Sequence, residues 1–153
     1  MQYDHTQTAP LYLLHVGVGI AILIGGWLTP EVVVQIILYC SGGLMFLFAL
    51  SFRQLNVSDE GDRLLISFGP LPLFRRCIDY SDIETVERGR TTILDGWGIH
   101  LSPSGGWTWN LWGFDCVDVW YRKNSKVKKV RIGTDDSVGS EAFLKERVGQ
   151  KGK

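Results

Sequence analysis

The chain has 153 residues, and its 16 Lys and Arg residues balance 16 Asp and Glu residues, so its formal net charge is zero. This balance, without a dense basic cluster, argues against nucleic acid as a partner. The three cysteines, Cys40, Cys77 and Cys116, lie too far apart in the sequence to indicate a zinc site or a redox pair.

Two long apolar runs dominate the first third of the chain. They cover residues 11–29 and 32–52, are 19 and 21 residues long, and contain no Asp, Glu, Lys or Arg. As helices they would extend about 28–31 Å, which matches the hydrocarbon core of a bilayer. Only Pro30 and Glu31 separate them, so the runs predict a two-helix transmembrane hairpin.

The distribution of Lys and Arg predicts how this hairpin is oriented. None occurs before Arg53, which is the first of the 16. Because positive residues next to a span stay in the cytoplasm, we expect a multi-pass protein of the inner (cell) membrane with both termini cytoplasmic. The first ten residues contain no basic side chain, so the first run is expected to be a retained span and not a signal peptide.

Small residues recur every four positions along one face of the first span, at Gly17, Ala21 and Gly25. Such spacing lets two helices approach closely. The stripe has two interpretations: packing within the hairpin, or a docking face for another membrane protein.

Residues 53–148 form the predicted soluble domain. Residues 1–10, before the hairpin, and residues 149–153, after the domain, are expected to be tails. Short apolar alternations separated by turn residues are typical of antiparallel strands. Turns are expected at 59–62, 69–72 and 104–106. A final helix is expected to begin at Asp136 or Ser137, with an apolar stripe through Phe143, Leu144 and Val148. The expected strands are Gln54–Ser58, Arg63–Phe68, Phe74–Tyr80, Asp82–Arg90, Trp97–Ser102, Trp107–Trp112, Cys116–Arg122 and Val127–Gly133.

Four segments together resemble a bacterial pleckstrin-homology-like (PH-like) domain carried on a membrane hairpin. They are RLLISFGPL (63–71), the strand start at 83–87, GWGIHLSPSGGWTWNLWG (96–113) and VRIGTDD (130–136). The resemblance covers residues 53–147. It implies an α+β membrane protein whose strongly bent, seven-stranded antiparallel sandwich or barrel is capped by a C-terminal α-helix. It also implies binding or assembly and not catalysis.

Five of the six tryptophans fall within 24 residues, and they form the first candidate site. Trp107 and Trp109 would share one face of an extended strand, and Trp112 would take the other. Either the rings pack in the core, or they form an exposed ledge for a partner protein or the nearby bilayer. The five are Trp97, Trp107, Trp109, Trp112 and Trp120.

Basic side chains form a second candidate, for contact with anionic lipid or simply as a solvated surface. The candidates are Arg75, Arg76, Lys126, Lys128 and Lys129. Eukaryotic PH domains grip inositol phosphates with basic residues around the first strand turn. The corresponding turn here, residues 59–62, is acidic and would repel phosphate, which argues against that kind of headgroup recognition.

The sequence groups no nucleophile, base and acid, so no catalytic, cofactor or metal residue is predicted. Asp135 and Asp136 are expected to cap the last helix and not to bind a metal. An acid–histidine pair in the structure would reopen this question.

The leading hypothesis is a non-catalytic integral membrane protein that presents a cytoplasmic PH-like domain for protein–protein interaction or assembly. Its alternatives are an anionic-lipid-sensing module and an accessory subunit of a transporter or membrane enzyme. The expected partners are the bilayer and either another protein or a second copy of the chain. No cofactor is expected.

Overall fold

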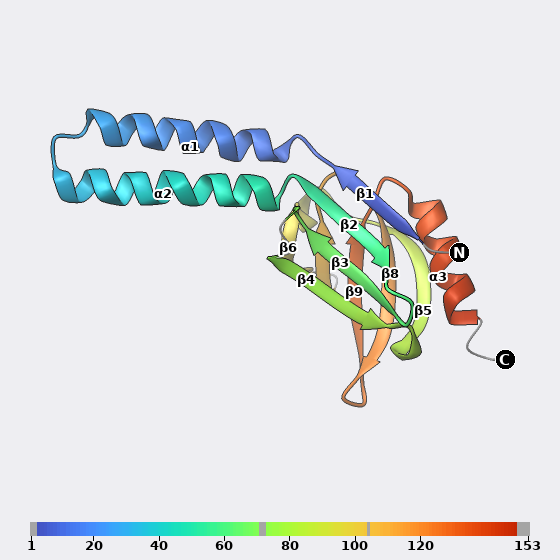
Figure 1. Ribbon diagram of the computed structural model, residues 1–153. Helices are drawn as coiled ribbons and strands as arrows, with labels where there is room; N and C mark the ends of the chain where they lie inside the picture. Colours follow the sequence, from blue (N-terminus) through green and yellow to red (C-terminus); the bar gives the residue numbers. More distant parts are fainter. Residues whose placement is uncertain (1–2, 71–72, 104, 150–153) are drawn as a thin grey trace.

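A computed structural model describes residues 3–70, 73–103 and 105–149. The expected turn positions Leu71, Pro72 and Ser104, and the tail from Gln150 onward, lie outside these residues. Helices α1 (Leu11–Leu28) and α2 (Val32–Ser51) form an antiparallel pair that projects from an α+β domain (Figure 1). Both helices are long and apolar enough to cross a membrane, as the sequence predicts.

Glycines set the close approach of the two helices. A Cβ built on Gly42 would come within 2.8 Å of Leu23 Cγ and 3.3 Å of the Gly19 carbonyl oxygen, and one on Gly26 would meet the Tyr39 ring at 2.9 Å. Open space surrounds a Cβ built on Gly17 or Gly25. The α1–α2 contact therefore uses Gly19, Gly26 and Gly42, and not the predicted stripe.

The strands form two sheets. The first has the order β1-β2-β3-β4 and the second the order β5-β8-β9-β7-β6, with β7 and β9 parallel and the other neighbours antiparallel. The strands are β1 (Asp4–Thr8), β2 (Gln54–Asp59), β3 (Arg63–Phe68), β4 (Phe74–Asp79), β5 (Ile83–Arg90), β6 (Gly98–Leu101), β7 (Trp107–Asn110), β8 (Asp115–Lys123) and β9 (Lys126–Gly133). Nine strands in the described chain replace the seven implied by the resemblance, and the sheets do not close into a barrel.

The extra strand β1 occupies the segment expected to be a tail. It pairs with β2 from Asp4↔Ser58 to Thr8↔Gln54. The hairpin therefore connects two neighbouring strands of one sheet, and Ala9 N donates to Arg53 O across its base. Because the chain is paired on both sides of the helices, the base of the hairpin is fixed to the domain at two points.

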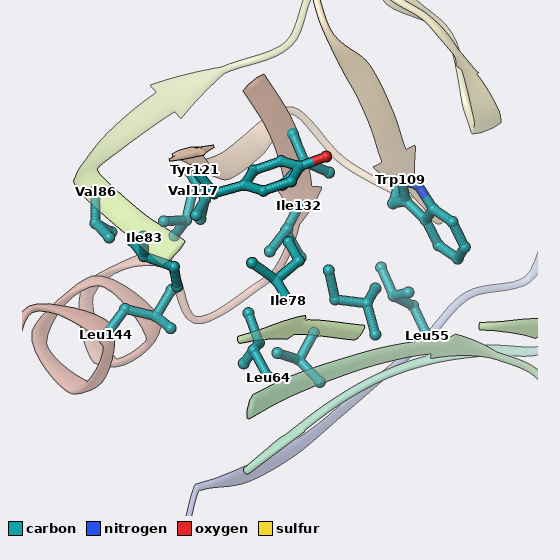
Figure 2. Packing of buried hydrophobic residues seen from close by; sticks show 14 of the residues in the cluster. Leu55, Leu64, Ile78, Ile83, Val86, Trp109, Val117, Tyr121, Ile132 and Leu144 are labelled. Atoms are coloured by element: carbon teal, nitrogen blue, oxygen red, sulfur yellow. The ribbon is translucent and has the colours of Figure 1, made fainter. Parts of the chain in front are cut away.

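Apolar side chains fill the space between the two sheets (Figure 2). Leu55 and Leu64 come from the first sheet, Val117 and Ile132 from the second, and each is at most 3% exposed. Helix α3 (Ser137–Gly149) adds Leu144 to one end of this core. The core therefore holds the two sheets face to face although neither sheet is closed.

Helix α3 connects the two sheets. Its Glu141 pairs with Arg88 of β5 at 2.8 Å, and its Arg147 pairs with the buried Asp59 of β2. Asp136 Oδ1 accepts a hydrogen bond from Gly139 N at 2.9 Å, so the predicted cap at Asp136 is confirmed. The helix covers an open end of the structure, as the resemblance implies.

Candidate interaction surfaces

The five clustered tryptophans do not form one ledge. Trp109 is 6% exposed and packs 5.8 Å from the Phe68 ring, so it belongs to the core (Figure 2). Trp97 stacks on Trp112 with ring centroids 4.5 Å apart. Trp107 is about half exposed and lies apart from this pair, in a groove described below. The two neighbours differ in what they meet: Trp109 pairs with Ile99 and packs on Phe68 of the first sheet, whereas Trp107 pairs with the exposed Leu101 at the end of β6.

The Trp97–Trp112 pair lies at the base of the hairpin. The Gln7 amide of β1 donates to the Trp112 carbonyl oxygen at 3.0 Å. Gly98, the residue after Trp97, lies against Phe52, the residue that follows α2; a Cβ built on Gly98 would be 3.7 Å from that ring. The stacked Trp97–Trp112 pair therefore lies next to the junction between the hairpin and the domain.

Trp107 and Trp120 line a separate groove of about 490 Å³ beside β9. Strand β7 pairs with β9 only from Val130 to Ile132. Within the described strands, residues 126–129 of β9 have a neighbour on the β8 side alone. The groove combines this open strand edge with aromatic side chains, which is a surface that an extended polypeptide can occupy.

The Lys129 ammonium is already engaged at this groove. Its Nζ lies 2.8 Å from Asp118 Oδ2 and 5.0 Å from the centroid of the Trp120 ring. The positive charge is thus largely neutralised, while Lys126 and Lys128 on the same strand are exposed.

The predicted lipid-contact residues also separate. Arg75 is exposed near the start of β4, and Arg76 donates to the Tyr121 hydroxyl while lying over that ring. Lys126 is the first residue of β9, directly after the β8–β9 turn, which projects from the domain (Figure 1). The five basic residues therefore come from two strands in different sheets, β4 and β9.

A buried ionic network on the outer face of the second sheet had no signal in the sequence. Arg131 donates to both carboxylate oxygens of Asp118, at 2.8 and 3.2 Å, and lies 3.4 Å from Asp95. Asp95 also accepts from Ser102 and from the Thr92 backbone. These contacts hold the short 3₁₀ turn at Ile93–Asp95 against β9, so the network has a structural role.

The hydrogen-bonding groups around the two aspartates determine their pKa values. The Ser102 hydroxyl and the Thr92 backbone N–H lower the pKa of Asp95. Burial alone would raise the pKa of Asp118, but the hydrogen bonds and charges of Arg131 and Lys129 lower it below its ordinary value. Both carboxylates are therefore fixed as anions at neutral pH and are poor proton donors.

An acid–histidine pair joins the two ends of the described chain. His5 Nε2 lies 2.6 Å from Asp135 Oδ1, and the adjacent Tyr3 hydroxyl is 2.5 Å from Ser140 Oγ. Ser140 is only 5% exposed and its hydroxyl is held by Tyr3, so a substrate cannot reach it. The arrangement attaches β1 to the start of α3 and does not provide an accessible nucleophile.

Of the three free cysteines, Cys116 is buried, whereas Cys40 and Cys77 are exposed. Burial, followed by the charge of Asp118, raises the pKa of Cys116 to about 12, which keeps it a neutral thiol. Among the described residues, no three His, Cys, Asp or Glu side chains come together to hold a metal.

No protein-family model matches the chain, and a search of curated proteins found no significant relative.

Proposed function

We propose that this protein is a membrane-anchored, non-catalytic module that presents a cytoplasmic PH-like domain to another protein or to a second copy of itself. The observation that carries the proposal is the groove beside residues 126–129 of β9, which joins an open strand edge to the half-exposed Trp107.

The apolar surface of the hairpin supports membrane anchoring. Large apolar side chains such as Leu14, Ile24 and Val33 are between 51% and 70% exposed. Soluble domains rarely expose a continuous apolar surface of this extent. The arginines after α2 favour the cytoplasm for the domain.

The architecture supports the PH-like assignment in outline. Two mainly antiparallel sheets face each other over one core, and a C-terminal helix covers an open end. Strand β1 and the parallel pairing of β7 with β9 depart from the seven-stranded pattern.

The groove favours an extended, acidic partner segment. A strand added along this edge, beyond the end of β7, would extend the second sheet, while Trp107 and Trp120 supply apolar contact. The exposed Lys126 and Lys128 flank the same edge and would attract acidic side chains.

The test is the mass of the intact protein extracted from its native membrane in mild detergent, for wild type, Trp107→Ala and Trp97→Ala. The two tryptophans are matched, at 46% and 45% exposed. We expect wild type and Trp97→Ala to give one larger assembly, and Trp107→Ala to give the monomer. An unchanged assembly in Trp107→Ala, or a wild-type monomer, would contradict the groove as the binding surface. Urea unfolding of each variant checks that the domain remains folded.

The outward-facing stripe of α1 favours a second candidate, an accessory subunit of a membrane complex. Gly17 and Gly25 border open space and Ala21 is exposed, so this face is free to approach another helix. Ala21→Leu would then dissociate the assembly while Trp107→Ala leaves it intact, which is the reverse of the result expected for the groove.

A further inference from the structure

Exposed apolar side chains surround the base of the hairpin on the domain itself. We call them the base surface: Leu73, Phe74, Ile93, Trp97 and Trp112, which are 62%, 38%, 84%, 45% and 38% exposed. They come from three connections between strands and from Phe74, the first residue of β4. Side chains of this kind are costly to leave in water, so their concentration at one end of the domain calls for a partner.

Contacts around Phe52 place these residues together. The Phe52 ring stacks 6.4 Å from Phe74 on one side and 5.7 Å from His15 of α1 on another. Gly98 lies against the same ring, which brings the preceding Trp97 and its stacked partner Trp112 to the hairpin. The β6 strand lies beside the junction of α2 and β2 in Figure 1.

Ile93 lies in the same connection between β5 and β6 as Trp97. Its carbonyl oxygen accepts from Gly96 N at 3.2 Å, and the Gly96 carbonyl is held by the Asn110 amide. The same Asn110 amide donates to Gly113 O, next to Trp112. Ile93 therefore projects from the loop that carries Trp97, and among the described side chains of the domain it is the most exposed large apolar one.

Charged residues at the rim of the base surface are mainly arginines. Arg53 and Arg75 are exposed beside Phe52 and Phe74. Arg90 is 76% exposed near the same end and pairs at 3.4 Å with Asp115. Tryptophan rings flanked by arginines match the boundary between lipid headgroups and acyl chains, where the ring is buried and the guanidinium meets phosphate.

We propose that the base surface lies in the lipid interface around the hairpin. The domain is then held against the bilayer in one orientation and does not rotate freely relative to the membrane. The bilayer is the occupant because the base surface is continuous with the apolar surface of α1 and α2 through Phe52 and His15. The inference rests on the proposed membrane anchoring. It also assigns a role to Trp97 and Trp112 that is separate from the groove at Trp107.

The experiment compares single spin labels in the full chain reconstituted into nanodiscs of mixed zwitterionic and anionic phospholipid. Labels are attached at Ile93→Cys, at Val138→Cys and at Ile24→Cys, in a background carrying Cys40→Ala and Cys77→Ala. Val138 is 62% exposed on α3, away from the hairpin, and serves as the control in water. Ile24 lies on α1 and reports insertion of the hairpin.

We expect the Ile93 label to be reached several-fold less by a water-soluble nickel relaxation agent, and more by oxygen, than the Val138 label. Equal accessibility of Ile93 and Val138 to nickel would overturn the inference. Shielding of Ile93 from both reagents would also overturn it, because it would show a protein cover instead of lipid. Exposure of the Ile24 label to nickel would instead refute the membrane anchoring itself.

Discussion

Replacing Arg131 by Met is expected to destabilise the domain strongly, because it removes the centre of the buried ionic network. The change breaks the two-pronged contact with Asp118 and the contact with Asp95. The side chains of Arg131 and Asp118 are each only 9% exposed. Without Arg131, the buried Asp118 keeps only Lys129 as a counter-charge and Asp95 loses the guanidinium, and breaking a buried ion pair in this way costs about 3–5 kcal/mol.

The assay is urea unfolding of the full chain in nanodiscs, followed by tryptophan fluorescence. A loss of about 4 kcal/mol at a slope of about 2 kcal/mol per molar urea lowers the midpoint by about 2 M. The matched control is Arg122→Met, which removes an exposed ion pair with Glu84. Its expected loss is below about 1 kcal/mol. Equal midpoints for the two variants would refute the structural role of the network.

The same network predicts the acid sensitivity of the domain. The folded-state pKa values of Asp95 and Asp118 lie below their ordinary value of 3.8. Their stabilisation is therefore complete above that pH and is lost as the pH falls through the lowered values. We expect the wild-type urea midpoint to fall as the pH is lowered below about 4, more steeply than that of Arg131→Met, in which Asp118 keeps only Lys129. Parallel pH profiles would contradict this reasoning.

Three further outcomes are expected. Trp109→Ala should lower the free energy of unfolding by about 3–5 kcal/mol because it empties a core position, whereas Trp107→Ala should change it by less than about 1 kcal/mol; urea midpoints compare the two. Cys116 should resist iodoacetamide in the folded protein at pH 8 and react after unfolding, while the exposed Cys77 reacts in both states, as intact mass will show. Gly42→Leu should force α1 and α2 apart, because a Cβ there meets the opposite helix, and a longer distance between spin labels on the two helices would report it.

The sequence predicted the elements whose signal is local. The absence of charge over two long runs located α1 and α2 to within one residue at each end. Alternation of apolar and polar residues, in segments bounded by turn residues, predicted the positions of β2–β9. Asp136 predicted the start of α3. Strand β1 was missed because Asp4–Thr8 is polar and has no alternation. It forms through pairing with β2, which lies on the far side of the hairpin in the sequence.

The sites depended on contacts that the sequence does not contain. Trp107 and Trp109 have the same local pattern, and only the position of Phe68 on the other sheet decides which ring is buried. Asp95 and Arg131 are 36 positions apart in the sequence, so no local pattern predicts their contact. The first span offers two faces of small residues, and the pairing with α2 selects the one containing Gly19.

Chemical labelling of single cysteines in sealed native membrane vesicles tests most directly whether the hairpin crosses the membrane and returns the chain to the same sheet. The sites are Asp4→Cys on β1, Glu31→Cys between the helices, and Asn124→Cys on the β8–β9 turn, in a background carrying Cys40→Ala and Cys77→Ala. The account predicts that an impermeant reagent reaches residues 4 and 124 from the cytoplasmic side and residue 31 only from the opposite side. Labelling of residues 4 and 124 from opposite sides, or of all three from one side, would contradict it.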